Sequence, residues 1–226
     1  MGKYKSREMS HHPPSKRATV KRIPDRGVYD RATIDAILDQ GLICHVGFSA
    51  NGQTFVLPTI HVRIDDKIYL HGSPASRLLQ ALASGAEACL TVTLVDGLVL
   101  ARSAMHHSMN YRSVVLFGTA FLVEDEAEKL AVLQALTEHL IPGRWADVRG
   151  PTPQELRQTL VLAIPIQEAS AKVRIGPPVD DEPDYDLPIW AGVIPLRLSA
   201  AEAVADPKLK PGVEPPAYAM NYAGPR

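Results

Sequence analysis

The sequence predicts a mainly β fold (α+β class), an antiparallel barrel of about six strands with short flanking helices. Apolar segments of strand length follow one another, joined by short turns, and few helical segments lie between them. Neither the G-x-G-x-x-G nor the G-x-x-x-x-G-K-[ST] pattern is present. The first observation excludes a doubly wound α/β sheet for the first half of the chain. The second means that any nucleotide binds without a Rossmann fold or a P-loop.

The first half begins with a short helix, which Asp30 caps and Gly41 ends. A strand follows, and Asn51-Gly52 then predicts a hairpin, since both residues tolerate the positive φ of a type I′ turn. A second turn at Asp65 completes three strands that we expect to form an antiparallel meander. The predicted helix covers residues 30–41, and the strands cover 43–48, 54–62 and 68–71.

The second half alternates two helices with longer strands. Ser73 is the expected N-cap of the first helix, and the pattern Thr152-Pro-Gln-Glu155 opens a helical turn as a capping box. The helices are predicted over residues 74–85 and 125–140, and the strands over 88–94, 98–101, 113–124 and 160–173.

Composition indicates one domain with two extensions. The chain has 226 residues, 46% of them hydrophobic and 22% charged, as is usual for a globular protein. Residues 1–27 are predicted to be a basic disordered arm, residues 28–175 the barrel domain, and residues 176–226 an irregular C-terminal arm that packs on the barrel or on a partner. The clustered prolines and acidic residues after Gly176 mark the second boundary.

The basic arm carries most of the charge asymmetry. Its first 26 residues hold eight Lys or Arg against Glu8 and Asp25, a net charge of +6 in a chain whose formal net charge is −1. Such an arm is either a solvated tail or a contact for nucleic acid or another acidic surface. We expect the solvated tail, so nucleic acid is not an expected partner.

Cysteine usage and hydropathy indicate a cytoplasmic protein. Cys44 and Cys89 lie in apolar segments without metal-site spacing, which predicts buried reduced thiols and neither a disulfide framework nor a zinc site. No apolar stretch is long enough to span a bilayer, and the N-terminus lacks the pattern of a secretory signal.

A phosphate site is one interpretation of the segment from His71 to Arg77. A strand ends there, Gly72 allows close backbone approach, and a short helix begins. Ser73, Ser76 and Arg77 add hydroxyl and guanidinium donors of the kind that bind phosphate oxygens. The alternative is a capped helix with an exposed arginine.

Two further segments carry polar groups near strands. Residues 106–113, with Tyr111, Arg112 and Ser113, either line a ligand or form a surface loop. The adjacent His106 and His107 point in opposite directions in an extended chain, so no metal site is predicted. Lys172 shares a strand face with Ser170 and Arg174, which suits either an anion or solvent.

Isolated aromatic side chains leave alternatives open. Trp190 stands between two prolines, where it stacks on a planar ligand, attaches the arm to a neighbour, or is buried against the protein's own core. His45 and His61 fall in predicted strands, where most histidines are structural.

Taken together, these segments resemble the pyridoxamine 5′-phosphate oxidase-like FMN-binding split-barrel family, most closely its nitroimidazole-resistance-type branch. The likeness covers about residues 28–195. It rests on the Asn51-Gly52 hairpin and on short motifs in a fixed order: residues 56–59, 68–73, 76–77, 110–114, 117–118, 172–174 and 190–192.

The resemblance implies a six-stranded split barrel and a homodimer with FMN at each subunit interface. Pro58 and Thr59 would contact the flavin ring. Residues around the ribityl phosphate would come from the strand-to-helix segment, and others from the neighbouring strand and the C-terminal part. The implied cofactor residues are Pro58, Thr59, His71, Gly72, Ser73, Ser76, Arg77, Tyr111, Arg112, Ser113, Lys172 and Trp190. Leu78 stands where pyridoxamine phosphate oxidases have lysine, so another substrate is expected.

The expected function is an FMN-dependent oxidoreductase that passes electrons from a reduced nicotinamide to a small oxidised acceptor, such as a nitro compound or a quinone. No catalytic residue is implied, because the cofactor carries the hydride chemistry. The alternatives are a non-catalytic FMN-binding or storage protein, and a haem-binding or deazaflavin (F420) member of the same fold. His45, His61 and His106 are the histidines considered as haem ligands.

Overall fold

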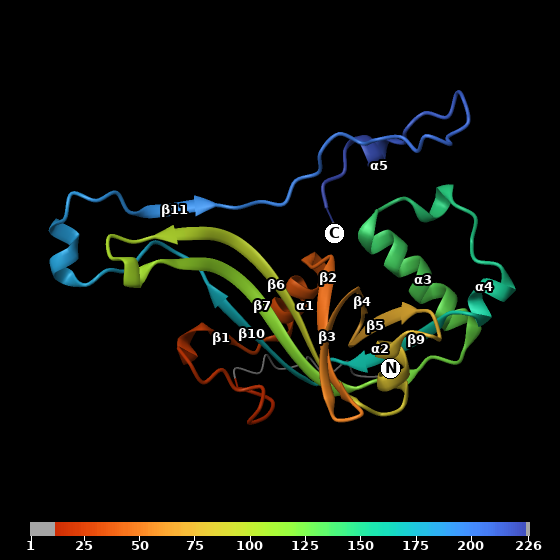
Figure 1. Cartoon of the computed structure of the whole chain (residues 1–226), viewed down its shortest axis with the longest axis horizontal. Coiled ribbons are helices and arrows are strands. Elements are labelled where there is room, and N and C mark those ends of the chain that lie inside the picture. The colour runs from red at the N-terminus through yellow and green to blue at the C-terminus, as the bar shows by residue number, and fades with distance from the viewer. Residues whose placement is uncertain (1–11, 225–226) are drawn as a thin grey trace, which may run out of the picture.

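The computed structural model describes residues 12–224; residues 1–11 and 225–226 lie outside this description. Its strands form two antiparallel sheets (Figure 1). The larger sheet runs β1-β10-β7-β6-β2-β3, with β11 beside β6, and the smaller sheet runs β4-β5-β9-β8. The strands are β1 (Gly27–Val28), β2 (Ile43–Ala50), β3 (Gln53–Ile60), β4 (Val62–Ile64), β5 (Lys67–Gly72), β6 (Glu87–Leu100), β7 (Ser108–Thr119), β8 (Phe121–Leu122), β9 (Leu160–Pro165), β10 (Glu168–Arg174) and β11 (Gly192–Pro195).

Short helices flank the two sheets. Asp30 caps the first helix and Asp125 the third, and Thr152 and Glu155 complete the predicted capping box of the fourth. The helices are α1 (Arg31–Gln40), α2 (Arg77–Ala83), α3 (Glu126–Leu140), α4 (Pro153–Arg157) and α5 (Ala217–Met220). Four 3-10 turns are η1 (Pro24–Arg26), η2 (Ala104–His106), η3 (Trp145–Asp147) and η4 (Glu182–Asp186).

The main core lies on one face of the larger sheet. Alternate residues of β2 and β6 are buried there against α1, α2 and the smaller sheet, because successive side chains of a strand point to opposite faces. A second cluster fills the space between the smaller sheet and α3. The two sheets do not close into one cylinder, so the predicted fold is confirmed as a split barrel.

The first hairpin has the predicted geometry. Asn51 and Gly52 adopt φ angles of 51° and 74°, and β2 pairs with β3 along its whole length. A type I′ turn needs positive φ at both central residues, which is the reason for the Asn-Gly sequence.

Two strand predictions were wrong. The three-strand meander does not form, because the chain leaves the larger sheet at His61 and β4 pairs with β5 in the smaller one. The single strand over 160–173 is two strands, β9 and β10, which lie in different sheets. Pro165 ends β9, since proline cannot donate a ladder hydrogen bond.

The strands β6 and β7 form a long curved hairpin that extends beyond β2 and β3, and the C-terminal arm lies around its tip (Figure 1). The pairing is interrupted between Val95 and Gly97, where the register shifts. Strand β11 of the C-terminal arm pairs with the outer part of β6. From there the chain returns in an extended path to the segment that follows α3, where the Tyr218 hydroxyl donates to Asp147 of η3 over 2.8 Å. Within residues 12–224, no helix combines the length and apolar character needed to cross a membrane.

His61 lies at the point where the chain changes sheets. Its side chain is fully buried, its Nε2 donates to the Leu38 carbonyl over 3.0 Å, and its Nδ1 has no hydrogen-bond partner within residues 12–224. Burial lowers the pKa of His61 to about 4. The folded protein therefore holds this ring neutral at pH values where the unfolded chain protonates it.

We predict that His61 makes stability fall in mild acid. The unfolded ring takes up a proton below about pH 6.5, whereas the folded ring stays neutral down to about pH 4. The contribution of the neutral His61 ring to stability is therefore fully present above the unfolded pKa, and it is lost as the pH falls through this window. Between pH 7 and pH 5 the wild type should lose about 2 kcal/mol more than His61→Gln, measured by urea unfolding. The exposed His107→Gln variant should behave like the wild type; equal losses in His61→Gln and wild type would contradict the prediction.

Candidate functional site

The larger sheet has a second face that its helices do not cover. Strand register places one residue from each of five neighbouring strands in a row across this face, since directly paired residues share a side of the sheet. The row consists of Pro58 on β3, His45 on β2, Thr91 on β6, Val115 on β7 and Ser170 on β10. We call this surface the outer face.

Ser113 and Lys172 form part of the next row on the outer face. The two residues pair directly in register, together with Thr93 of β6. The Ser113 hydroxyl donates to the Lys172 carbonyl over 3.3 Å. The structure therefore brings together two of the predicted cofactor residues that are far apart in the sequence.

The basic arm crosses the outer face. Arg17 bonds to Glu87 and to Glu168, and its guanidinium lies 4.8 Å from the centroid of the Phe117 ring. Ala18 is buried, and the Val20 N–H donates to the Tyr29 hydroxyl. The sequence predicted a disordered arm, but residues 12–27 follow a defined path against the sheet; residues 1–11 lie outside the described residues. Only the spatial pairing of Arg17 with two distant acids reveals this order.

A cavity of about 360 Å³ lies between the arm and the outer face. Its sheet side carries Ser113, Val115, Phe117, Ser170 and Lys172, and its other side is formed by arm residues 17–22. Among residues 12–224, four cations and no acidic side chain line the cavity; the cations are Arg17, Lys21, Arg22 and Lys172. The sequence interpretation had assigned Lys21 and Arg22 to a solvated tail, so their place in a cavity was missed.

The segment from His71 to Arg77 lies at the other side of the larger sheet. Ser76 caps α2, where the sequence had placed Ser73. The Ser73 hydroxyl instead accepts from the Ala75 N–H over 3.2 Å, and the Arg77 guanidinium lies 4.8 Å from the centroid of the Phe55 ring. Helix α2 packs into the main core, so within one chain this segment does not meet Ser113 and Lys172.

His71 and Gly72 end β5, just before this segment. The Nδ1 atom of His71 is buried and has no hydrogen-bond partner within residues 12–224, and burial lowers the pKa of the ring. This nitrogen is enclosed by protein in the single chain.

Pro58 and Thr59 lie on β3, the edge strand of the larger sheet. Pro58 is exposed, and so are its neighbours Val56 and Leu57. An exposed apolar edge of this kind invites pairing or packing by another surface.

Tyr111 and Arg112 lie one behind the other on β7, on opposite faces. Arg112 makes two hydrogen bonds to the Asp96 carboxylate, at 2.9 and 2.7 Å, and a third to Gln40. The bonds to Asp96 raise the pKa of Arg112. This guanidinium is already bound within the chain, whereas Tyr111 pairs with Arg174 of β10 on the outer face.

Trp190 lies far from the other predicted residues, before β11 on the outer part of the hairpin. Its side chain is 68% exposed, and its ring sits so close to Gly192 that a Cβ there would meet it at 2.9 Å. Within one chain it reaches none of the other residues of the predicted set.

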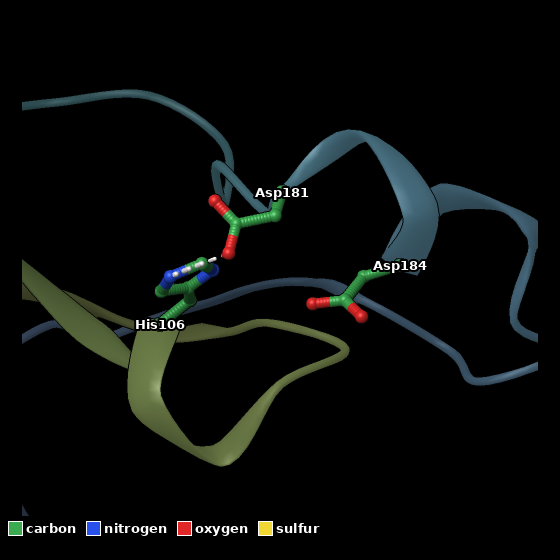
Figure 2. A group of neighbouring side chains, drawn as sticks. All are labelled: His106, Asp181 and Asp184. Atoms are coloured by element: carbon green, nitrogen blue, oxygen red, sulfur yellow. Dashed lines mark ion pairs between the residues drawn. The ribbon is translucent and has the colours of Figure 1, made fainter.

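His106 takes part in a cluster at the tip of the hairpin (Figure 2). Its Nε2 lies 3.8 Å from Asp181 and its Nδ1 3.7 Å from Asp180, and one ligand atom each of His106, Asp181 and Asp184 falls within 4.8 Å of the others. His107 instead bonds to the Ser103 carbonyl. Histidine and carboxylates suit a divalent cation, and the cluster also ties the C-terminal arm to the tip. The sequence showed the acidic run, but its closeness to His106 depends on the fold.

Known proteins share sequence and fold with this chain. A family model described as pyridoxamine 5′-phosphate oxidase matches residues 30–173. The flavocytochrome Anf3 from Azotobacter vinelandii is 46% identical with a TM-score of 0.86, and the match covers 92% of this chain and 97% of that one. The FAD and haem binding protein from Mycobacterium smegmatis is 35% identical with a TM-score of 0.84, over 88% of this chain and 98% of that one.

A third structure matches less of the chain. A protein from Bacteroides thetaiotaomicron named for 5-nitroimidazole antibiotic resistance is 25% identical with a TM-score of 0.54, over 65% of this chain and 86% of that one. No curated protein sequence matches this chain.

We predict that Arg112 stabilises the fold through Asp96. Arg112→Gln should lower the free energy of unfolding by about 1 kcal/mol, because it removes a two-pronged ion pair that is only partly exposed to solvent. In a double-mutant cycle measured by urea unfolding, Asp96→Asn should cost little more once Arg112 is replaced. Fully additive effects of the two substitutions would show that the pair contributes nothing.

Proposed function

Because this chain belongs to the pyridoxamine 5′-phosphate oxidase family, we propose that it is an oxidoreductase that binds a flavin and a haem. The proposal rests on the large share of this chain that two solved structures match. The flavocytochrome matches 92% of this chain and the FAD and haem binding protein 88%, whereas the nitroimidazole-resistance protein matches 65%. A match over 92% necessarily includes part of both arms, which the family model leaves out.

The proposed flavin is FAD. The sequence resemblance implied FMN, which shares the ring and the first phosphate with FAD. The Mycobacterium smegmatis protein is named for FAD, and it is similar to this chain over nearly its whole length. The basic cavity beside the outer face supports the larger cofactor, because FAD brings a second phosphate that needs compensation.

The residues that would hold the flavin fall into the groups described above. Two cations of the predicted set, Arg77 and Lys172, form no ion pair with an acidic residue within residues 12–224. Pro58 and Thr59 would supply an apolar edge for the ring. When bound, the flavin accepts a hydride from a two-electron donor and passes the electrons on. The side chains would bind and orient it and limit access of water.

His45 is the proposed haem ligand. Among the histidines considered from the sequence, His61 is fully buried with its Nε2 bonded to Leu38, and His106 faces two aspartates. His45 is exposed on the outer face, beside Pro58, and no hydrogen bond or ion pair involves its ring within residues 12–224. Iron binds the neutral imidazole of such a side chain.

We place both cofactors in a homodimer. Arg77 and Lys172 lie on different sides of the larger sheet, so one chain alone would not place them on one flavin. The exposed strand β3, with Val56 at 63% exposure, offers an apolar surface for a second copy. Sedimentation of the purified protein as a monomer would contradict the dimer.

The proposed reaction transfers two electrons from a reduced nicotinamide through the flavin to a small oxidised acceptor of the nitro or quinone type, in the cytoplasm. A protein that only stores the flavin is the alternative. Oxidation of the nicotinamide by the purified protein, with an acceptor present, separates the two.

We predict that the purified, unsupplemented protein is coloured. Its absorption spectrum should show flavin bands together with a Soret band, and acid release should yield FAD. Flavin bands without a Soret band, even after reconstitution with haemin, would remove haem from the proposal. A colourless protein that takes up neither cofactor would contradict the function itself.

We also predict that His45→Ala loses most of its haem but keeps its flavin. The reason is that the variant removes an iron ligand from the outer face without touching the buried core. His107→Ala is the matched control, since that ring is also exposed and bonds only to a backbone carbonyl. Soret absorbance per subunit measures the effect, and wild-type haem content in His45→Ala would exclude this ligand.

A further inference from the structure

The cavity beneath the basic arm has an unbalanced charge. Arg17 is neutralised by Glu87 and Glu168, both outside the cavity lining. Lys21 and Arg22 enter from the arm and Lys172 from β10, and none of these three forms an ion pair within residues 12–224. Lys21 and Arg22 are exposed to solvent at the edge of the cavity, so an anion bound there would pair with them without displacing an acidic partner from residues 12–224.

The remaining lining indicates what kind of anion fits. Val115 and Phe117 form an apolar floor on β7, while the hydroxyls of Ser113 and Ser170 lie on the same outer face. An inorganic ion would leave the apolar floor unused. A phosphate attached to a flat base would use both the cations and the floor.

The size of the cavity sets a limit on the ligand. Its volume of about 360 Å³ is at the low end for ligand pockets, which span about 300–1,000 Å³. It suits a mononucleotide or one half of a dinucleotide.

We propose that this cavity binds the adenylyl half of a dinucleotide, with Lys21, Arg22 and Lys172 around its phosphate and the adenine over Val115 and Phe117. The inference rests on the proposed function, in which the dinucleotide is FAD. A reduced nicotinamide dinucleotide carries the same adenylyl group and is the second source. In either case Arg17 has a structural part: its bonds to the two glutamates hold the arm across the sheet and so complete the cavity.

The test compares two lysines of the same arm. Lys21 lines the cavity, whereas Lys16 is exposed and does not line it. Full-length protein, stripped of flavin, is titrated with FAD and with FMN for the wild type, Lys21→Ala and Lys16→Ala. We expect Lys21→Ala to weaken FAD about tenfold and to leave FMN unchanged, because FMN has no adenylyl half. Lys16→Ala should change neither affinity.

Lys172→Ala removes a cation that the sheet contributes to the cavity. Because Lys172 is not part of the arm, an effect of this variant would not result from a simple loss of arm structure. It too should weaken FAD more than FMN. If Lys21→Ala and Lys16→Ala have the same effect, or if FAD and FMN weaken equally, FAD is not the occupant of the cavity, and the AMP titration decides whether the cavity binds an adenylyl group.

AMP alone separates this proposal from the proposed function. We expect AMP to bind the stripped wild type, measured by calorimetry, and to bind Lys21→Ala about tenfold more weakly. AMP binding without uptake of either flavin would uphold the cavity while contradicting the proposed function. Loss of AMP binding after FAD loading identifies FAD as the occupant, whereas AMP binding that persists in the loaded protein identifies the nicotinamide donor. No AMP binding at millimolar concentration would overturn the proposal.

Discussion

The pairing of β6 with β7 is the constraint on which the rest of the structure depends. Its register runs from Glu87 opposite Thr119 to Val99 opposite Ser108, so it fixes which residues face inward over most of the larger sheet. One face buries Leu90, Val92 and Val114 in the main core. The opposite face, the outer face, therefore carries Thr91, Ser113 and Val115, and the proposed cofactor-binding residues lie among them. A slip of one residue would exchange the two faces, so the core itself specifies the outer face.

Local sequence chemistry determined much of the fold. The Asn51-Gly52 turn, the Asp30 cap and the Thr152 capping box appear in the structure as predicted, because each depends on residues within one turn of the chain. The change of sheets at His61 has no such local signal: no glycine or proline marks it, and only the packing of β4 against β5 reveals it. The predicted family was confirmed because its motifs combine many such local features.

The candidate site was predicted less completely than the fold. Ser113 and Lys172 were expected to share a site, and they pair directly. Arg112 was included from its place in a motif, but its guanidinium is bound to Asp96, a residue whose proximity depends on the hairpin register. Lys21 and Arg22 were missed because composition alone does not distinguish a solvated basic arm from one that Arg17 fastens to two glutamates.

The uneven distribution of charge along the sequence helps to explain why the basic arm lies on the sheet. An arm of net charge +6 is attracted by a barrel and C-terminal arm of opposite sign. Arg17 pairs with two glutamates and the buried Ala18 follows it, so this part of the arm lies on the sheet. The neighbouring Lys21 and Arg22 form no ion pair within residues 12–224. Had acidic residues on β7 or β10 paired with these lysine and arginine side chains, the arm would bind more tightly but would offer nothing to an anion. The cations of the cavity therefore provide a place where a negatively charged ligand can bind both the arm and the sheet.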